Sequence, residues 1–222
     1  MIPHPRGCKP HCRAAVCYPE RMNFLAHLVL AGDNEDLRLG ALLGDFVRGN
    51  RALEQYPAAL RRGIRLHRHI DAFTDELPEV VALRRTFDKP FRRYSGILID
   101  LGLDHELARH WDRYSKVALE QFDRDVRTLL DRRSEYVPER LKRFMAYADR
   151  RGLFASYASR EEVLHSLRGV GRRLSRPNPL HRADEIWDEF EPRLATAFEP
   201  VFAAVQSAVR SWLNTKSTTT GS

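Results

Sequence analysis

Apolar residues recur three and four positions apart along most of this chain, which is the spacing of one face of an α-helix. Alternating runs of β-branched residues, which indicate strands, are few. The pattern predicts an all-α protein folded as a compact, single-domain helical bundle, without a sheet. The predicted helices cover residues 23–31, 36–47, 58–73, 78–86, 91–119, 120–133, 138–151, 160–174 and 179–213. Pro192 and Pro200 are expected to kink or divide the last of them.

The two ends of the chain lack this helical pattern. Residues 1–21 are rich in proline, cysteine, histidine and basic side chains, and the first apolar run begins at Met22. Residues 214–222 are small, polar and rich in threonine. We therefore expect one helical domain over residues 22–213, between a disordered N-terminal extension (1–21) and a disordered tail (214–222).

The composition is that of an ordinary globular protein, with 43% hydrophobic and 30% charged residues. No apolar run approaches the roughly 18 residues of a membrane-spanning helix. The three cysteines fall within residues 1–21, at a spacing that matches no closed zinc site and no disulfide framework, and this segment has no apolar core of a signal peptide. We expect a cytoplasmic protein that does not bind a membrane.

The charge balance favours anionic partners. Lysine and arginine total 37 against 30 acidic residues, a formal net charge of +7. A nucleic acid, a phosphorylated small molecule and an acidic protein all remain open as partners. The arginines are spread along the chain in pairs, which is also typical of ordinary solvated helix faces.

Several histidines and aspartates interrupt otherwise apolar helical runs. His27 stands in FLAHLVL, Asp45 stands in LLGDFV, and Asp104 and His105 follow ILIDLGL. A charged side chain that is buried without a partner costs several kcal/mol, so these groups need a shared explanation. A single buried histidine such as His27 is often simply hydrogen-bonded, and that structural alternative stays open for it.

The spacing of these residues favours a metal centre. His67 and Asp71 are four residues apart and therefore share one helix face. Imidazoles and carboxylates without a thiolate suit Mn, Fe, Zn or Mg, whereas phosphate-binding loops and the serine-hydrolase elbow are absent from the sequence. The sequence predicts a hydrolytic metal centre with the ligands Asp45, His67, Asp71, Asp104 and His105, and with His27 as a further candidate.

Four stretches carry a resemblance to a known family. They are MNFLAHL at 22–28, GDFVRGN at 44–50, LHRHIDAFTD at 66–75 and DHELARHW at 104–111. The chain resembles the acyl carrier protein phosphodiesterases from residue 22 to about residue 212, and that family is similar to the all-helical HD phosphatases. The resemblance implies an enzyme that uses Mn2+, with Mg2+ or Fe2+ as alternatives, to hydrolyse 4′-phosphopantetheine from holo acyl carrier protein.

The predicted metal centre also suggests roles for single residues. Catalysis falls to Asp45, His67, Asp104 and His105. Arg48, Arg68 and Arg109 are close in sequence to the predicted ligands and are predicted to bind phosphate, with ordinary surface arginines as the open alternative. Acyl carrier proteins are acidic, so the basic surface becomes a docking surface. Two alternatives stay open: an HD-type phosphohydrolase of a nucleotide or another small phosphodiester, and a basic helical module that binds nucleic acid. The second is disfavoured because it leaves the buried acids unexplained, and the sequence does not fix the oligomeric state.

Overall fold

The computed structural model describes residues 24–148 and 154–217 of this protein. The predicted extension at 1–21 and the end of the chain from residue 218 lie outside the described residues. The described part is helical and contains no strand, which confirms the all-α prediction. Its α-helices are α1 (Phe24–Leu30), α2 (Glu35–Leu43), α3 (Gly49–Leu53), α4 (Ala58–Glu76), α5 (Pro78–Thr86), α6 (Ser95–Arg109), α7 (Leu119–Arg132), α8 (Glu139–Ala148), α9 (Arg160–Arg173) and α10 (Asp184–Ser217).

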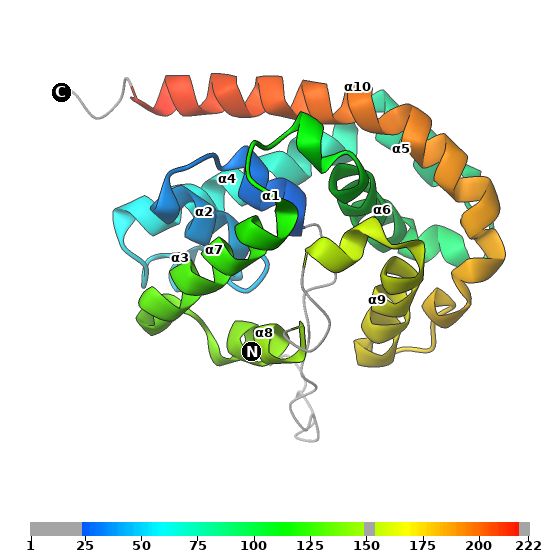
Figure 1. Ribbon diagram of the computed structural model, residues 1–222, viewed down its shortest axis with the longest axis horizontal. Helices are drawn as coiled ribbons and strands as arrows, with labels where there is room; N and C mark the ends of the chain where they lie inside the picture. The colour runs from blue at the N-terminus through cyan, green and yellow to red at the C-terminus, as the bar shows by residue number, and fades with distance from the viewer. Residues whose placement is uncertain (1–23, 149–153, 218–222) are drawn as a thin grey trace, which may run out of the picture.

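Three of the predicted helices differ clearly from the observed ones. The helix predicted over residues 36–47 ends at Leu43, so Asp45 lies in the turn that follows it. The single helix predicted over residues 91–119 is wrong: the short 3-10 helices η1 (Phe91–Tyr94) and η2 (Trp111–Arg113) flank α6. The chain turns at η2 because the buried Trp111 packs on Phe122 and donates its indole N–H to the carbonyl of Val117, 2.6 Å away. The last helix, α10, begins later than predicted, at Asp184, and continues to Ser217, beyond the predicted boundary at 213. Of the two outcomes expected at its prolines, division does not occur, and the helix is continuous and bent (Figure 1).

Helices α2 and α4 cross at a backbone-to-backbone contact. A Cβ atom on Gly40 would lie 2.4 Å from the carbonyl oxygen of Leu60 and 2.7 Å from the Cα of Gly63. Such distances are too short for any side chain, so these glycines allow the two helices to approach closely. The close crossing holds α4, which carries His67 and Asp71, against the end of α2, which leads into Asp45.

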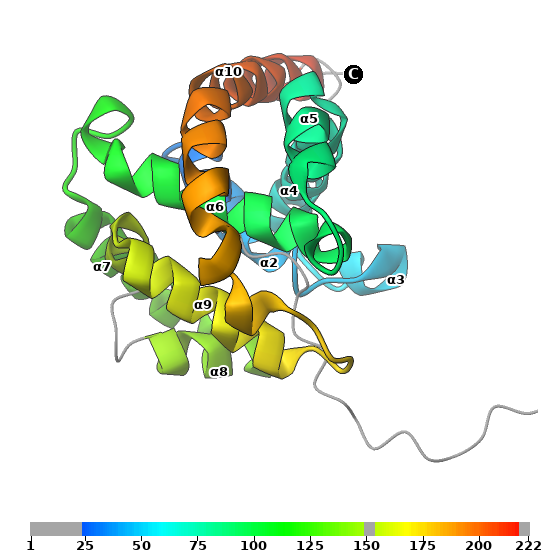
Figure 2. The ribbon, with the colours of Figure 1, turned by 90° about the vertical axis from the view of Figure 1, so that its right-hand side faces the viewer.

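Helix α6 lies at the centre of the bundle. All of its residues except Gly96 and Arg109 are buried, so it has no solvated face. Helix α10 runs along one side of the bundle, and α7, α8 and α9 lie on the opposite side of α6 (Figures 1 and 2). The buried polar residues of α6 are thereby placed between two halves of the molecule. No helix in the described ranges combines the length and the apolar character needed to cross a membrane.

Candidate metal centre

Four polar side chains from three parts of the chain meet beside α6. His27 comes from α1, Asp45 from the turn after α2, and His67 and Asp71 from successive turns of α4. The Nε2 atom of His27 lies 3.1 Å from Oδ1 of Asp71, and Nε2 of His67 lies 3.3 Å from Oδ2 of the same carboxylate. Nε2 of His67 is also 3.7 Å from Oδ1 of Asp45. Asp71 therefore bridges the two histidines, and Asp45 closes the group, which we call the His27 cluster.

The two imidazole rings of the cluster are stacked. Their centroids are 4.0 Å apart, at an interplanar angle of 25°. Gly44, which precedes Asp45, makes room for one of them: a Cβ atom on Gly44 would lie 2.1 Å from Cγ and 2.3 Å from Cδ2 of His67. The position of the His67 ring thus depends on the absence of a side chain at residue 44.

The His27 cluster fits a divalent metal ion. One atom each from His27, His67 and Asp71 all lie within 4.8 Å of one another, a spread that one ion can bridge. Oδ2 of Asp45 and Nδ1 of each histidine are buried and have no hydrogen-bond partner in the described part of the chain. Buried polar atoms are rarely left in this state, so unsatisfied donors and acceptors gather at this point. Imidazole nitrogen with carboxylate oxygen suits Mn, Fe, Zn or Mg.

The ionisable residues of the His27 cluster differ in the direction of their pKa shifts. For His67, burial opposes the charged form, but the hydrogen bonds and charges of Asp45 and Asp71 outweigh it and raise the pKa to about 10. Burial, followed by the neighbouring charge of His67, lowers the pKa of His27. Burial also acts against ionisation of Asp71, yet its bonds to the two histidines hold its pKa far below the ordinary value. Without metal the cluster therefore contains a neutral His27 and a His67 imidazolium between two carboxylates.

Asp104 stands beside this cluster and holds the first turn of α1. Its two carboxylate oxygens accept hydrogen bonds from the backbone N–H groups of Leu25 and Ala26, both at 2.9 Å. Helix N-termini leave such N–H groups without partners, so Asp104 caps α1 from another helix. Burial, partly offset by these two bonds, raises the pKa of Asp104 to about 8, and the charge of Asp45 adds to the rise. The structure thus places Asp104 where it fixes the helix that carries His27.

His105 follows Asp104 but belongs to a different group of side chains. Its Nδ1–H donates to the carbonyl of Tyr157 at 2.6 Å, and its Nε2 lies 3.4 Å from Oε1 of Glu191 on α10. His105 and Glu191, together with the buried Glu106, form a second set in which the ligand atoms lie close enough to hold an ion. The structure does not bring His105 together with the His27 cluster.

The three arginines predicted to bind phosphate have different surroundings. Arg68 donates to the carbonyls of Val47 and Gly49, and so braces the loop after Asp45. Arg48 is exposed at the start of α3. Arg109 lies 3.1 Å from Glu106 and 3.2 Å from Glu191, away from the His27 cluster. Their roles in phosphate binding stay predictions.

Comparison with known proteins identifies the family. A sequence profile described as acyl carrier protein phosphodiesterase matches residues 22–205, which include the whole His27 cluster. The chain belongs to this family.

Proteins named acyl carrier protein phosphodiesterase are its relatives. The one from Photorhabdus laumondii is 36% identical over 160 residues, which cover 72% of this chain and 80% of that protein. The one from Yersinia pestis is 38% identical over 153 residues, covering 68% and 79% of the two chains. The one from Shigella boydii serotype 18 is 49% identical over 94 residues, covering 42% and 48%. No solved structure matches, and the similarity to HD phosphatases stays a prediction.

The raised pKa of His67 gives the metal-free phosphodiesterase a definite pH dependence. A histidine whose pKa is higher in the folded than in the unfolded protein stabilises the fold fully below about pH 6.5, and this stabilisation is lost as the pH rises through about 10. The raised pKa of Asp104 likewise stabilises the folded protein at low pH, and this stabilisation is lost as the pH rises through about 8. We expect the Tm of the metal-free protein to fall between about pH 8 and pH 10, and the apparent affinity for a divalent ion to rise, because the ion displaces a proton from His67.

Both effects are measurable with one variant as the control. In the parent protein, thermal unfolding should show a Tm that falls with pH, and ion titrations should show an affinity that rises with pH. The His67→Gln variant should lose both pH dependences between about pH 8 and pH 10. A parent protein whose ion affinity does not change with pH would contradict the protonated state assigned to His67.

Proposed function

We propose that this protein is a metal-dependent phosphodiesterase that hydrolyses 4′-phosphopantetheine from holo acyl carrier protein and leaves the apo protein. The observation that carries the proposal is the His27 cluster, a set of buried metal-type ligands inside the region that matches the family profile. The relatives' printed names supply the reaction and the carrier protein. A cytoplasmic location and an acidic protein partner follow from the same proposal.

His27, Asp45, His67 and Asp71 are the proposed ligands, and the ion is Mn2+, with Mg2+ or Fe2+ as alternatives. When bound, the ion supplies Lewis-acid chemistry: it makes water a better nucleophile and offsets negative charge on the phosphoryl group. Asp71 is the most open of the four, with 21% of its side chain exposed against 0% for His27, 3% for His67 and 8% for Asp45. The scissile phosphate is therefore expected to reach the cluster past Asp71.

The other residues of the site position these ligands in the proposed mechanism. Asp104 holds the start of α1, and with it the register of His27. Arg68 fixes the loop that follows Asp45, and the exposed Arg48 in that loop is proposed to bind a non-bridging phosphate oxygen. Water attacks phosphorus, the bond from phosphorus to the serine oxygen breaks, and that oxygen leaves with a proton.

A mass measurement tests the proposal directly. Holo acyl carrier protein incubated with the protein and Mn2+ should lose the mass of 4′-phosphopantetheine, and excess chelator should stop the reaction because the ligands then hold no ion. Apo carrier protein should keep its mass. Hydrolysis of a small phosphodiester such as bis(p-nitrophenyl) phosphate without any change in the carrier protein would instead favour the HD-type phosphohydrolase, and full turnover after exhaustive removal of metal would rule out the metal mechanism.

A further inference from the structure

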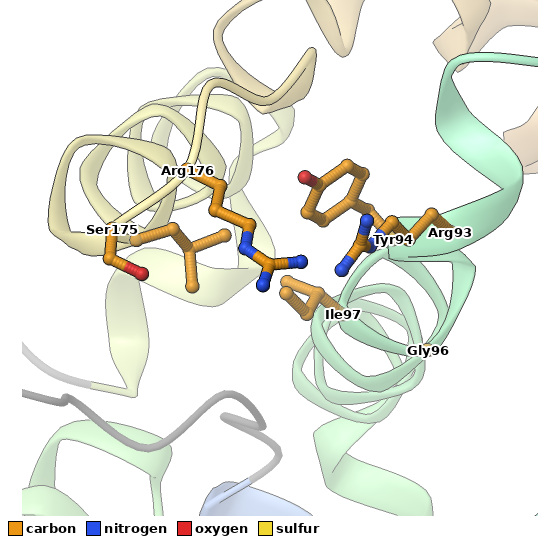
Figure 3. A pocket seen from close by; sticks show the side chains of 7 residues that line it. Arg93, Tyr94, Gly96, Ile97, Ser175 and Arg176 are labelled. Carbon is orange, nitrogen blue, oxygen red and sulfur yellow. The ribbon is translucent and has the colours of Figure 1, made fainter. Parts of the chain in front are cut away.

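A pocket opens between the start of α6 and the chain that follows α9. Its volume is about 530 Å3, and its lining residues are Arg93, Tyr94, Gly96, Ile97, Leu174, Ser175 and Arg176. The guanidinium groups of Arg93 and Arg176 point into this pocket toward each other from the two sides, with the ring of Tyr94 beside them (Figure 3). We call it the Arg93 pocket.

The two arginines of the Arg93 pocket have no acidic partner among the described residues. Neither guanidinium forms a hydrogen bond or an ion pair with any of them, and none of the described residues that line the pocket is acidic. Other arginines of the chain are paired, for example Arg84 with Asp75, Arg113 with Glu199 and Arg133 with Asp36. Two like charges that converge in a concave site repel each other, so an anion bound between them is favoured.

The start of α6 adds to this positive potential. Helix α6 begins at Ser95 without a side-chain cap, and its positive dipole end faces the same pocket. At Gly96 nothing lies within 4 Å of where a Cβ would stand, so the first turn is open to a ligand. Within the part of the chain that the structure describes, the pocket thus combines two guanidinium groups without acidic partners and a helix N-terminus without a side-chain cap.

The pocket lies close to the metal centre along α6. Ile97, which lines the pocket, and Asp104, which caps α1 beside the His27 cluster, are seven residues apart and so share one face of α6. Seven residues of α-helix span about 10 Å. A protein partner that covers roughly 800 Å2 reaches about 16 Å in every direction from the centre of its interface. An interface of that size centred on the metal centre is therefore wide enough to include a site 10 Å away along α6, such as the Arg93 pocket.

We propose that the Arg93 pocket docks the acyl carrier protein by binding carboxylates on its surface. This inference rests on the proposed function. Holo acyl carrier protein carries its phosphodiester at the reacting serine, and that group must lie at the metal centre during hydrolysis. The anion that reaches a second site about 10 Å away is therefore an aspartate or glutamate side chain of the carrier protein. Arg93 and Arg176 bind it through charge-assisted hydrogen bonds, which hold the substrate in register.

Charge reversal tests the docking role. The single variants Arg93→Glu and Arg176→Glu are compared with Arg210→Glu, which changes the net charge by the same amount at an exposed position near the C-terminal end of α10. The double variant of Arg93 and Arg176 is tested as well. Each single change in the pocket is expected to raise KM for holo carrier protein roughly 5- to 10-fold with kcat unchanged, because a lost interface charge weakens the encounter. Turnover of bis(p-nitrophenyl) phosphate should stay at the parent level, and Arg210→Glu should leave KM within about 2-fold of the parent value.

A binding measurement separates the two proposals. Binding of apo carrier protein, measured by titration calorimetry, should weaken in the pocket variants by the same factor as KM rises. If the parent protein hydrolyses holo carrier protein and the double variant does so with the same KM, the docking site is overturned and the proposed function stands. If binding of the carrier protein depends on Arg93 and Arg176 but no hydrolysis occurs, the docking site stands and the proposed function is overturned. An equal effect of Arg210→Glu, or no binding at all, would overturn the docking site.

Discussion

Replacing Asp71 by asparagine is expected to lower metal-dependent phosphodiesterase activity by at least about 10³-fold, because this carboxylate contacts both histidines of the His27 cluster. Stabilisation by a bound metal amounts to several kcal/mol, and about 4 kcal/mol corresponds to that factor in rate. Asparagine keeps the shape of the side chain and removes the charge. The loss should therefore appear as weaker ion binding and a lower kcat, while the helical content by circular dichroism stays that of the parent.

The control is the same substitution at an exposed aspartate of α7, Asp131→Asn, which should retain full activity. An Asp71→Asn protein that binds the ion and hydrolyses substrate at the parent rate would show that the metal lies elsewhere. The group formed by His105, Glu106 and Glu191 would then become the leading alternative, and Glu191→Gln would be the variant to examine.

A methyl group on Gly44 is expected to be almost as damaging as the loss of a ligand. The backbone of Gly44, at φ −52° and ψ −41°, is ordinary helical backbone that alanine adopts without strain. The side chain of His67 excludes a Cβ atom at this position, since that atom would lie 2.1 Å from Cγ, 2.3 Å from Cδ2 and 2.6 Å from Cβ of His67. The Gly44→Ala variant must displace this side chain, and a shift of about 1 Å costs roughly 10²-fold in rate.

Ion affinity is the measurement to make on Gly44→Ala, alongside turnover of a small phosphodiester. Gly96→Ala is the matched control, because the added Cβ meets no atom within 4 Å in the first turn of α6. Both variants should unfold with similar cooperativity. Parent-level ion affinity in Gly44→Ala would mean that His67 does not bind the ion from the ring position seen in the structure.

Part of the site could be predicted from the sequence, because helical spacing is visible there. His67 and Asp71, four residues apart, do share a face of α4 and lie within contact of each other. Asp104 and His105 show the limit of this reasoning. Neighbours on a helix differ by about 100° in direction, so Asp104 faces α1 while His105 faces Tyr157 and Glu191. Both look alike in the sequence, as polar residues in an apolar run, and only the packing of α6 separates them.

The remaining features of the site depend on contacts between distant segments. Glu191 lies 86 residues after His105 in the chain, and nothing in its own amphipathic helix distinguishes it from an ordinary surface acid. Gly44 belongs to one of the four stretches that carry the family resemblance, but its steric role arises only when α4 packs against the end of α2. Helix α3 was missed because its five residues are too few to show a period. The pairing of His27 with the cluster likewise follows from the packing of α1 against α2 and α6.

Helix α6 also constrains how the length of the chain can vary. One face of this helix spans from the Arg93 pocket at Ile97 to the carboxylate that caps α1 at Asp104. One inserted or deleted residue between these points would turn Asp104 by about 100° and shift it by about 1.5 Å, away from the N–H groups of Leu25 and Ala26. The chain between α9 and α10 carries Arg176 into the pocket and is held in place by Asn178, whose side-chain amide donates to the carbonyls of Gly171 and Arg176. Among relatives of this protein, insertions and deletions are therefore expected to be excluded between residues 97 and 104.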